Sequence, residues 1–384
     1  MRFLHLGDLH LGKSLGDFDL IGDQKYILDQ MLAVIRERTV DAVLIAGDVY
    51  DKAIPSEAAT NLLDYFLCRL AETGVKTFLI SGNHDSDDRL NYGSRLFQDN
   101  QIFISSVFRG ELEKYTVEDE QGEVDVYLLP FVKASQVRHY FPDAKIDSYD
   151  DAVRVIIEHA HLDRQKRNVI VAHQFVAGRS EDPVLAGSES IGTQSVGLVE
   201  KISYDCFDPF DYVALGHIHS PQHVGRETVR YCGTPLKYSF SEAGQQKSVT
   251  VVELLEKGNL RIREIPLKPL RDMRKLKGTY MEITSLSSYQ DTNTEDYVQI
   301  TLTDEEDIVD GMQKLRTVYP NLMRLEYDNR RTRENQEIAG TETVKRKSEL
   351  EYFEEFFELQ NNQPMNEEQR KYSEDLIRKI QEVK

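Results

Sequence analysis

Five short segments constrain this chain most, because each places metal-ligand residue types directly after a short apolar run. They are Gly-Asp-Leu-His at 7–10, Gly-Asp-Val-Tyr-Asp at 47–51, Gly-Asn-His-Asp at 82–85, Ala-His at 172–173 and Gly-His-Ile-His at 216–219. Half of the 10 histidines lie in these segments. Loops that follow the carboxyl ends of strands open toward one edge of a sheet, so their side chains can converge on one point. A glycine before a ligand lets the backbone turn sharply there.

The apolar runs themselves predict the fold class. They are short and rich in Val, Ile and Leu, as buried strands of a covered sheet are. Strands are expected at residues 3–6, 42–46, 76–80, 126–129, 168–172 and 212–215, and amphipathic helices at 23–38 and 56–70. Alternating strands and helices predict an α/β layered domain. Later strands at 229–232 and 248–254 follow without helices, so the second sheet is expected to be mixed or antiparallel.

The composition changes near residue 266, which predicts several domains. Pro266, Pro269 and the basic run 271–277 indicate a linker into a new unit. We expect a first domain over 1–268, a β-β-α-β domain over 269–330, a linker over 331–346 and a helical hairpin over 347–384. In the β-β-α-β domain the expected elements are strands 278–284 and 297–303, a helix at 304–319 and a strand at 322–327. The second helix of the hairpin begins at Asn366, with Gln369 completing a variant of the capping box.

Charge and cysteine usage exclude some classes of protein. The 47 basic and 66 acidic residues give a net charge of -19, which disfavours a protein that coats itself in nucleic acid by charge alone. The three cysteines, Cys68, Cys206 and Cys232, are widely spaced, so neither a disulfide framework nor a zinc ribbon is expected. No run approaches the roughly 18 apolar residues of a membrane span, and no cleavable apolar leader is visible, so a cytoplasmic location is expected.

The ligand types in the five segments select the class of metal. Imidazole mixed with carboxylate and carboxamide oxygen suits Mn²⁺, Fe²⁺ or Zn²⁺. Two aspartates, one asparagine and four histidines are too many donors for one ion and enough for two, with one carboxylate bridging. Two ions about 3.5–4 Å apart activate a hydroxide and hold a phosphoryl group for in-line attack. Each motif alone is more often a turn or a helix cap, but the five together in this order predict a di-metal site.

The other histidines are expected to have ordinary roles. His5 alternates with Leu4 and Leu6, which is typical of a packed strand residue or one supporting the site. Three histidines in helical surroundings, and a fourth near the last segment, have no partner motif: His139, His159, His161 and His223. The first three are expected at the surface, and nothing in the sequence requires His223 to reach the site.

These segments, in this order, resemble the motifs of the calcineurin-like metallophosphoesterase superfamily. The residues of these motifs are similar to those of its DNA double-strand-break nuclease branch. The segment Tyr-Cys-Gly-Thr-Pro-Leu-Lys-Tyr-Ser-Phe-Ser-Glu at 231–242 also resembles a stretch found in that branch. Protein serine/threonine phosphatases differ, because here Lys52 follows Asp51 and Asp85 stands where they carry glutamate. Cys232 is a mild departure from the branch. The resemblance covers the first 270 residues well and the rest in outline, and it implies a layered β-sandwich flanked by helices, with a small α+β cap domain and C-terminal helices.

The resemblance also implies a role for each residue of the site. One ion would be held by Asp8, His10 and His219, and the other by Asn83, His173 and His217. Asp48 would bridge the two ions, which are most often Mn²⁺ in this branch. His84 would not be a ligand; it would stand beside the scissile phosphate, stabilise developing charge and help to protonate the leaving oxygen. Asp51 would orient His84 by accepting its other ring proton on the carboxylate.

The activity implied by the resemblance is a Mn²⁺-dependent 3′→5′ double-strand exonuclease and a single-strand and hairpin endonuclease, which works with an ATPase partner in DNA end processing, repair and recombination. Two apolar stripes in the last forty residues fit such a partner: Phe353, Phe356 and Phe357, then Leu376 and Ile380. The alternative is that these helices pack back on the nuclease domain.

A homodimer is also implied. The apolar residues Leu62, Phe66, Leu70, Leu90, Leu96 and Phe97 would form a helix bundle across a two-fold axis, or they are ordinary core. Sequence leaves both interpretations open.

Two other functions compete with a nuclease. A small-molecule phosphodiesterase or phosphatase would share every ligand, but it would not need a cap domain with the basic residues Arg271, Arg274, Lys275 and Lys277 or the terminal helices. A non-catalytic scaffold would be expected to lack a ligand or His84, and none is missing. Lys13, Arg89 and Lys237 are expected to contact phosphate. If the chain is a nuclease, its net negative charge implies that it binds DNA weakly on its own. Dimerisation and the ATPase partner are then expected to supply much of the affinity for DNA.

Overall fold

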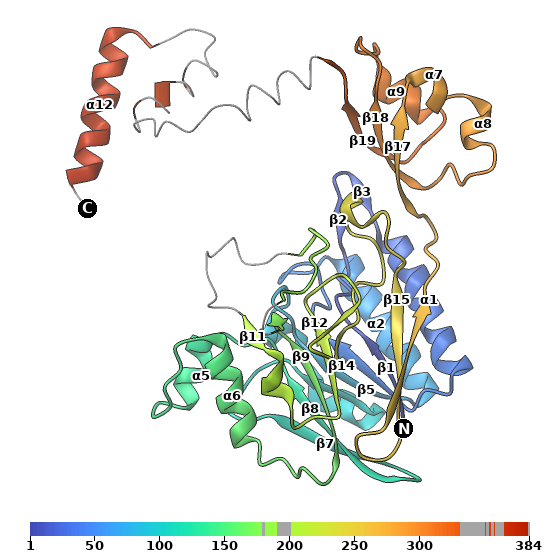
Figure 1. Cartoon of the computed structure of the whole chain (residues 1–384), viewed down its shortest axis with the longest axis vertical. Coiled ribbons are helices and arrows are strands. Elements are labelled where there is room, and N and C mark those ends of the chain that lie inside the picture. Colours follow the sequence, from blue (N-terminus) through green and yellow to red (C-terminus); the bar gives the residue numbers. More distant parts are fainter. Residues whose placement is uncertain are drawn as a thin grey trace. The chain divides into compact units, whose positions relative to one another are not determined.

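The computed structural model describes residues 1–178, 181–189, 201–330, 350, 353–354, 357 and 365–382. They form two compact units (Figure 1). The first comprises Met1–Lys277, Met281–Ile300 and Asp310–Leu325, and the second comprises Gly278–Tyr280, Thr301–Val309 and the described part of Glu326–Lys384.

The first unit contains a six-stranded mixed sheet. Its strand order is β16 (Leu260–Pro266), β15 (Ser248–Leu254), β1 (Arg2–Leu6), β4 (Ala42–Ala46), β5 (Lys76–Ile80) and β6 (Ile102–Ser105). The four strands from β1 to β6 are parallel, whereas β15 pairs antiparallel with both β1 and β16. Helices α1 (Ile21–Glu37) and α2 (Glu57–Thr73) connect β1 to β4 and β4 to β5. Ser56 caps α2 by accepting a hydrogen bond from the Ala59 amide, as its sequence position predicts.

A second six-stranded sheet has the order β13 (Gln222–Val224), β14 (Arg226–Tyr231), β12 (Tyr212–Gly216), β9 (Arg167–His173), β8 (Gly122–Leu129) and β7 (Glu113–Asp119). Its four inner strands are parallel, and the edge strands β7 and β13 are antiparallel to their neighbours. The expectation of a mixed second sheet is confirmed. The first sheet is mixed as well, because the late strands β15 and β16 join it.

The two sheets pack face to face with helices on both outer faces, which confirms the predicted layered α/β architecture. Phe3, Leu44 and Phe78 from the first sheet meet Val126 and Val171 from the second in a fully buried layer. Helices α1 and α2 cover the outer face of the first sheet, and α5 (Ala134–Tyr140) and α6 (Tyr149–His159) cover the second. Each sheet therefore buries both faces, which explains why the strands are almost wholly apolar.

The face of α2 that the sequence offered as a dimer contact is core. Leu62, Phe66 and Leu70 are buried against the first sheet, and Leu90 is buried with them. Leu96, by contrast, is 73 % exposed, and its neighbour Tyr92 is 86 % exposed. An amphipathic helix carries the same apolar stripe whether it packs on a sheet or on another copy of the chain, so the sequence alone does not separate the two.

The region expected to form a β-β-α-β unit has a different element order. The first strand, β17, spans Met273–Gly278, inside the expected linker, and the helices α7 (Tyr280–Ile283) and α8 (Leu286–Tyr289) follow where a strand was expected. Strands β18 (Tyr297–Leu302) and β19 (Leu322–Tyr327) confirm the later predictions. The basic run was misread as a linker because it alternates along a strand, with Met273 on the buried face.

The helix predicted over 304–319 is reduced to α9 (Gly311–Arg316). Asp310 has a left-handed backbone, with φ at 55°, and a right-handed helix cannot continue through it. The carboxylate of Asp304 accepts a hydrogen bond from the Tyr280 amide at 2.7 Å. Hydrogen bonds of this kind, from an Asp side chain to the backbone, compete with helix formation.

The remaining elements are short except for the last helix. They are β2 (Ser14–Leu15), β3 (Phe18–Asp19), α3 (Asp87–Leu90), α4 (Ser94–Phe97), β10 (Val176–Ala177), β11 (Ile202–Ser203) and α12 (Glu367–Glu382). The capping box of α12 is confirmed, because Asn366 and Gln369 exchange hydrogen bonds between amide and side chain at 3.0 and 2.9 Å. Arg370 pairs with Glu354 at 2.6 Å, which links α12 to the preceding helical segment. The expected linker over 331–346, Phe356 and the side chain of Ile380 lie outside the described residues.

All three cysteines are free thiols. In the described part of the chain, no helix is both long enough and apolar enough to pass through a membrane.

Candidate metal centre

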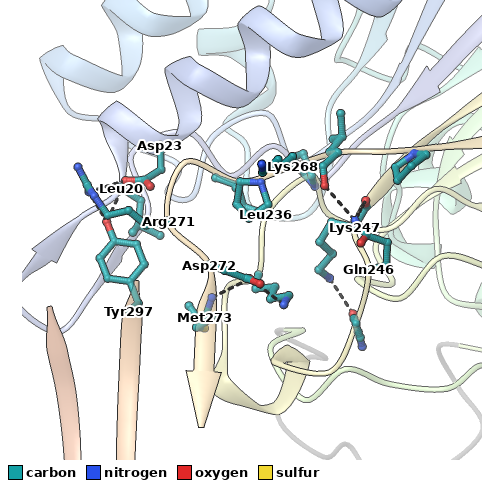
Figure 2. Close-up of a pocket in the computed structure, with 16 residues that line it drawn as sticks. Leu20, Asp23, Leu236, Gln246, Lys247, Lys268, Arg271, Asp272, Met273 and Tyr297 are labelled. Atoms are coloured by element: carbon teal, nitrogen blue, oxygen red, sulfur yellow. Dashed lines mark hydrogen bonds and ion pairs between the residues drawn. The ribbon is translucent and has the colours of Figure 1, made fainter. Parts of the chain in front are cut away.

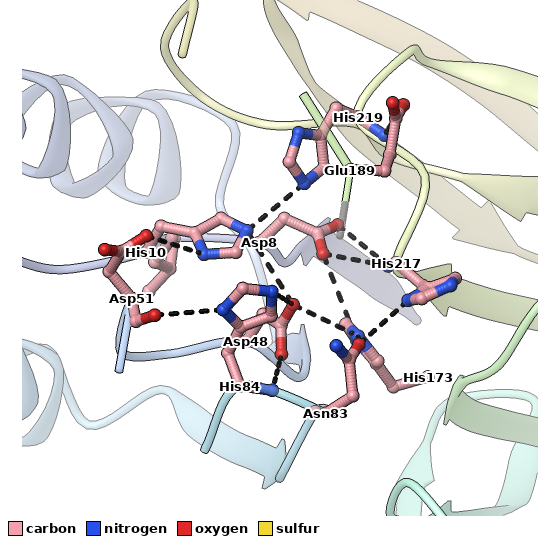
Figure 3. A network of polar contacts seen from close by, with 12 residues as sticks. Asp8, His10, Asp48, Asp51, Asn83, His84, His173, Glu189, His217 and His219 are labelled. Carbon is pink, nitrogen blue, oxygen red and sulfur yellow. Dashed lines mark hydrogen bonds and ion pairs between the residues drawn. The ribbon is translucent and has the colours of Figure 1, made fainter. Parts of the chain in front are cut away.

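The five ligand segments lie at the carboxyl ends of β1, β4, β5, β9 and β12, as predicted (Figure 3). The first three strands are neighbours in one sheet, and β9 and β12 are neighbours in the other. Since the sheets pack face to face, both sets of loops open at the same end of the sandwich.

Four of the site residues have strained backbones. The φ angles of Asp8, His10, Asp48 and His217 are 50°, 44°, 47° and 95°, in the left-handed region that side chains disfavour. Hydrogen bonds between the first two loops hold this conformation: the Asp8 amide donates to Gly47 O and the His10 amide to Asp48 O, both at 3.0 Å. Such strain persists where the surrounding structure imposes it, and it clusters at functional sites.

Glycines allow the loops to approach one another. A Cβ atom on Gly216 would lie 1.9 Å from the carbonyl oxygen of Ala46, and one on Gly82 would lie 2.1 Å from a carboxylate oxygen of Asp48. The Ala46 oxygen is a backbone atom, and the Cβ on Gly82 would also lie 2.4 Å from the backbone nitrogen of Asp48, so neither clash can be relieved by moving a side chain alone. The glycines that precede the ligands in the sequence are therefore required by close packing between the segments.

One group of ligand atoms comes from Asp8, His10 and His219. One donor atom from each lies within 4.8 Å of the others, and all three residues are buried. The Nε2 atoms of the two imidazoles face each other at 3.2 Å. This grouping matches the set predicted for the first ion.

A second group surrounds Asn83. Its Oδ1 lies 2.9 Å from Nδ1 of His217 and 3.1 Å from Nε2 of His173. Asp48 lies between the two groups: its Oδ2 is 3.4 Å from Nε2 of His173 and 3.7 Å from Nε2 of His10. A bridging carboxylate requires this intermediate position.

The charges around the site fit divalent cations. Asp8 and Asp48 are buried, and among the described residues neither pairs with a lysine or an arginine. A buried carboxylate needs a compensating charge, and oxygen with imidazole nitrogen is a donor set that divalent ions accept. The residues present therefore fit a centre with two metal ions.

Burial also sets the protonation of the ligands. It lowers the pKa of His10 to about 4 and of His217 to about 3, and it lowers the pKa of His219 further. These imidazoles are neutral at pH 7, which is the form that binds metal. Burial raises the pKa of Asp8 to about 8. Burial lowers the pKa of His173 as well, but Asp48 and Asp8 outweigh that effect and raise it to about 9.

His84 lies at the edge of this site. Its side chain is 18 % exposed, and its Nε2 lies 4.0 Å from Oδ2 of Asp48. Its Nδ1 lies 2.9 Å from the backbone oxygen of Asp51. The expectation that the Asp51 carboxylate accepts this proton is wrong: that carboxylate pairs with Lys13 at 2.6 Å and lies 3.6 Å from Nδ1 of His10.

Two residues that were quoted only for the family resemblance support the loops that carry the ligands. Asp85 is buried and accepts hydrogen bonds from the amides of Gly82, Val49 and Tyr50, so it ties the second and third segments together. Tyr238 donates to the carbonyl oxygen of Leu9 at 2.5 Å. Both lie in segments that the resemblance had quoted, and that was the available signal.

Other supporting residues were missed altogether. Gln24 donates to the carbonyl oxygen of His10 at 2.7 Å. Glu189 accepts from the His219 amide at 3.1 Å, and Ser188 lies 2.6 Å from Nδ1 of His219. No local motif marks these residues.

The basic residues expected to contact phosphate are largely engaged elsewhere. Besides Lys13, Lys237 pairs with Asp272 at 2.8 Å and Arg274 with Asp296 at 2.8 Å. Arg89 is exposed and lines a separate groove beside α2. Of the basic residues predicted for the cap, Lys275 is exposed, and it forms no ion pair with a described residue.

A cavity of about 370 Å³ gathers several of these cations (Figure 2). In its wall Arg271 pairs with Asp23 at 2.9 Å, and Tyr297 donates to the same carboxylate at 2.8 Å. Three of the cations that line this cavity already pair with carboxylates: Arg271 with Asp23, Lys237 with Asp272 and Lys247 with Glu242.

The remaining histidines behave as expected. His5 is buried, with Nδ1 at 2.8 Å from the Tyr212 hydroxyl and Nε2 at 3.2 Å from Leu215 O, so it is a packed strand residue. His139, His159, His161 and His223 are exposed.

Known proteins similar to this chain were found by sequence and by structure. The calcineurin-like phosphoesterase family model matches residues 1–221, and a model described as the type 5 capsule protein repressor C-terminal domain matches residues 269–361. The D subunit of nuclease SbcCD from Staphylococcus epidermidis is 36 % identical over 328 residues, which cover 85 % of each chain.

Among solved structures, a dimetal phosphatase from Danio rerio covers 70 % of this chain and 98 % of its own, with a TM-score of 0.40 and 12 % identity. A structure from Thermus thermophilus covers 68 % of this chain and 98 % of its own, with a TM-score of 0.38 and 11 % identity. These two likenesses are too distant to support an argument about function.

Proposed function

Since this chain belongs to the calcineurin-like phosphoesterases, and within them to the family of the SbcCD nuclease's D subunit, we propose that it is a Mn²⁺-dependent nuclease acting on DNA ends and hairpins. The proposed activities are 3′→5′ exonuclease cleavage of double strands and endonuclease cleavage of single strands and hairpins. The observation that carries the proposal is the buried position of Asp48 between two groups of ligand atoms.

In this proposal the two groups hold one ion each. The first ion is held by Asp8, His10 and His219, and the second by Asn83, His173 and His217, with Asp48 shared. When bound, two such ions activate a water molecule as the nucleophile and neutralise charge on the phosphoryl oxygens. Before metal binds, the imidazoles of His10, His217 and His219 are neutral at pH 7, which is the form that binds a metal ion.

His84 supplies the proton for the leaving oxygen. The carbonyl oxygen of Asp51 can only accept a hydrogen bond, so Nδ1 of His84 keeps its proton. Nε2 is then the atom that binds or releases the mobile proton, and the partly exposed ring leaves it open to a substrate. Asp51 acts through its backbone, as the group that fixes the ring.

The proposed partner is the SbcC ATPase, bound by the C-terminal helices. Phe353, Tyr372 and Leu376 are 43 %, 71 % and 48 % exposed, which leaves apolar surface for a partner. The alternative is that these helices pack back on the nuclease domain.

A homodimer within a heterotetramer is proposed to form through α2, α3 and α4. A groove of about 740 Å³ there is lined by Leu63, Leu67, Tyr92 and Phe97 among others. Together with the exposed Leu96, these residues replace Leu62, Phe66 and Leu70 as the proposed contact. Residues 269–330 are proposed as the domain that caps DNA, with Lys275 as an exposed cation.

The rival is a phosphodiesterase for small molecules. Initial rates of the full chain with Mn²⁺ on bis-p-nitrophenyl phosphate and on an end-labelled DNA hairpin separate the two. We expect the hairpin to be cleaved with a higher kcat/KM than the small ester. Efficient hydrolysis of the small ester without cleavage of the hairpin would contradict the proposal.

A further inference from the structure

A buried series of hydrogen-bonded side chains connects His219, in the candidate metal centre, to Lys247. The Oγ atom of Ser188 lies 2.6 Å from Nδ1 of His219 and donates to Oε1 of Glu242. The other oxygen of Glu242 pairs with Lys247 at 2.5 Å. Glu242 is fully buried and Lys247 is 4 % exposed, so this ion pair is shielded from water.

The position of each proton along this series of side chains follows from which groups can donate a hydrogen bond and which can only accept one. Glu242 receives hydrogen bonds from Lys247 and from the Tyr238 amide, so it acts as an acceptor. Ser188 has one hydroxyl proton, and it donates this proton in the hydrogen bond to Glu242. The Ser188 oxygen must then accept from His219, which places the proton of the neutral imidazole on Nδ1. The lone pair on Nε2 of His219 is left facing His10 and Asp8.

The backbone of His219 is anchored by the same groups. Lys247 donates to its carbonyl oxygen at 3.0 Å, and Glu189, next to Ser188, accepts from its amide at 3.1 Å. Ring and backbone are therefore held by one network, which leaves His219 little freedom to rotate. Histidines that bind metals commonly donate their other N–H to such a partner, and this raises ligand basicity.

We propose that Ser188 and Glu242 are positioning residues that hold His219 in the Nδ1–H tautomer, which leaves the Nε2 lone pair available to an ion that Asp8 and His10 would also hold. This inference deepens the proposed function and rests on its assignment of the first ion. It also gives a role to the end of the segment 231–242, because Glu242 closes that segment and Ser188 comes from a different loop.

Ser188 offers the sharper test. His173 donates its second ring proton to the backbone oxygen of Ala46 at 2.7 Å, which substitution cannot remove, whereas the partner of His219 is a removable hydroxyl. Ser188→Ala deletes it and Ser188→Thr retains it. Ser220→Ala is the matched control, because Ser220 is adjacent to His219 but bonds to Gln245 at 2.8 Å.

The first measurement is the tautomer of His219 in the full chain after metal removal. Long-range ¹H–¹⁵N spectra of ¹⁵N-histidine protein report it, with His219→Gln assigning the signal. We expect the Nδ1–H form in the wild type, in Ser188→Thr and in Ser220→Ala, and a shift toward the Nε2–H form in Ser188→Ala. A wild-type signal from the Nε2–H form overturns the inference, and this result requires no substitution.

The second measurement is Mn²⁺ affinity by calorimetry. Ser188→Ala is expected to weaken one of two sites by about 10- to 100-fold, with the other site unchanged. Wild-type affinity at both sites in Ser188→Ala contradicts the inference. Neither measurement uses DNA: a wild type with the Nδ1–H tautomer that fails to cleave hairpins would refute only the nuclease proposal.

Discussion

His84 and Asp51 are joined through a backbone carbonyl, with Nδ1 of the imidazole 2.9 Å from the Asp51 oxygen. The carboxylate of Asp51 points elsewhere, to Lys13. The group that fixes the His84 imidazole is therefore part of the loop itself and does not depend on the side chain at position 51.

His84→Ala tests the role of the imidazole. Since His84 lies outside both ligand groups assigned to the ions, we expect this variant to bind two Mn²⁺ ions per chain with wild-type affinity. Loss of the proton donor should reduce hairpin cleavage by about 10²- to 10⁴-fold. Calorimetry and a single-turnover cleavage assay measure the two effects, and loss of a metal ion in this variant would make His84 a ligand instead.

Asp51→Asn tests how the imidazole is held. The substitution keeps the backbone carbonyl and removes the charge that pairs with Lys13. We expect the cleavage rate to fall by much less than the about 10²- to 10⁴-fold expected for His84→Ala, because Nδ1 of His84 keeps its acceptor on the Asp51 backbone. A fall as large as that in His84→Ala would mean that the carboxylate orients His84 after all. His84→Ala, assayed in parallel, is the reference.

Metal binding should release protons. The pKa of Asp8 is raised to about 8 by burial, and that of His173 reaches about 9 beside Asp48, so both groups hold protons at pH 7 before metal binds. Mn²⁺ displaces them, and its apparent affinity should therefore rise with pH between about 7 and 9. Calorimetric titrations at pH 7 in buffers of different ionisation enthalpy count the protons. An observed enthalpy that does not depend on the buffer would refute this prediction.

Deletion of residues 345–384 tests the proposed role of the C-terminal helices. We expect the shortened chain to lose co-purification with SbcC and to keep metal-dependent cleavage of single-stranded DNA. The proposed metal ligands all precede residue 220, so the deletion leaves them in place. Retained co-purification with SbcC would show that the binding surface lies elsewhere.

The sequence was informative where local chemistry decides the structure. A glycine before a ligand and an apolar run before the glycine are local features, so Asp8, Asp48 and His217 were correctly placed at strand ends. The capping of α2 by Ser56 is local in the same way.

Long-range contacts could not be predicted in this manner. Ser188 and His219 are 31 residues apart, and Ser188 and Glu242 are 54 apart, so only the folded chain brings them together. The side-chain rotamers of His84 and Asp51 decide which oxygen of Asp51 accepts the hydrogen bond from His84. The spacing of residues in the sequence does not reveal these rotamers. The stripe of Leu62, Phe66 and Leu70 fits a sheet or a partner equally well, and only the packing shows that it is core.

The proposed nuclease activity is measured as cleavage of an end-labelled DNA hairpin by the full chain, with and without Mn²⁺. It should be run alone and with SbcC and ATP, with His84→Ala as the inactive reference. We expect Mn²⁺-dependent cleavage that is slow for the chain alone, faster with SbcC and ATP, and nearly absent in His84→Ala. Absence of cleavage with both Mn²⁺ and SbcC present, or equal cleavage by His84→Ala, would contradict this expectation.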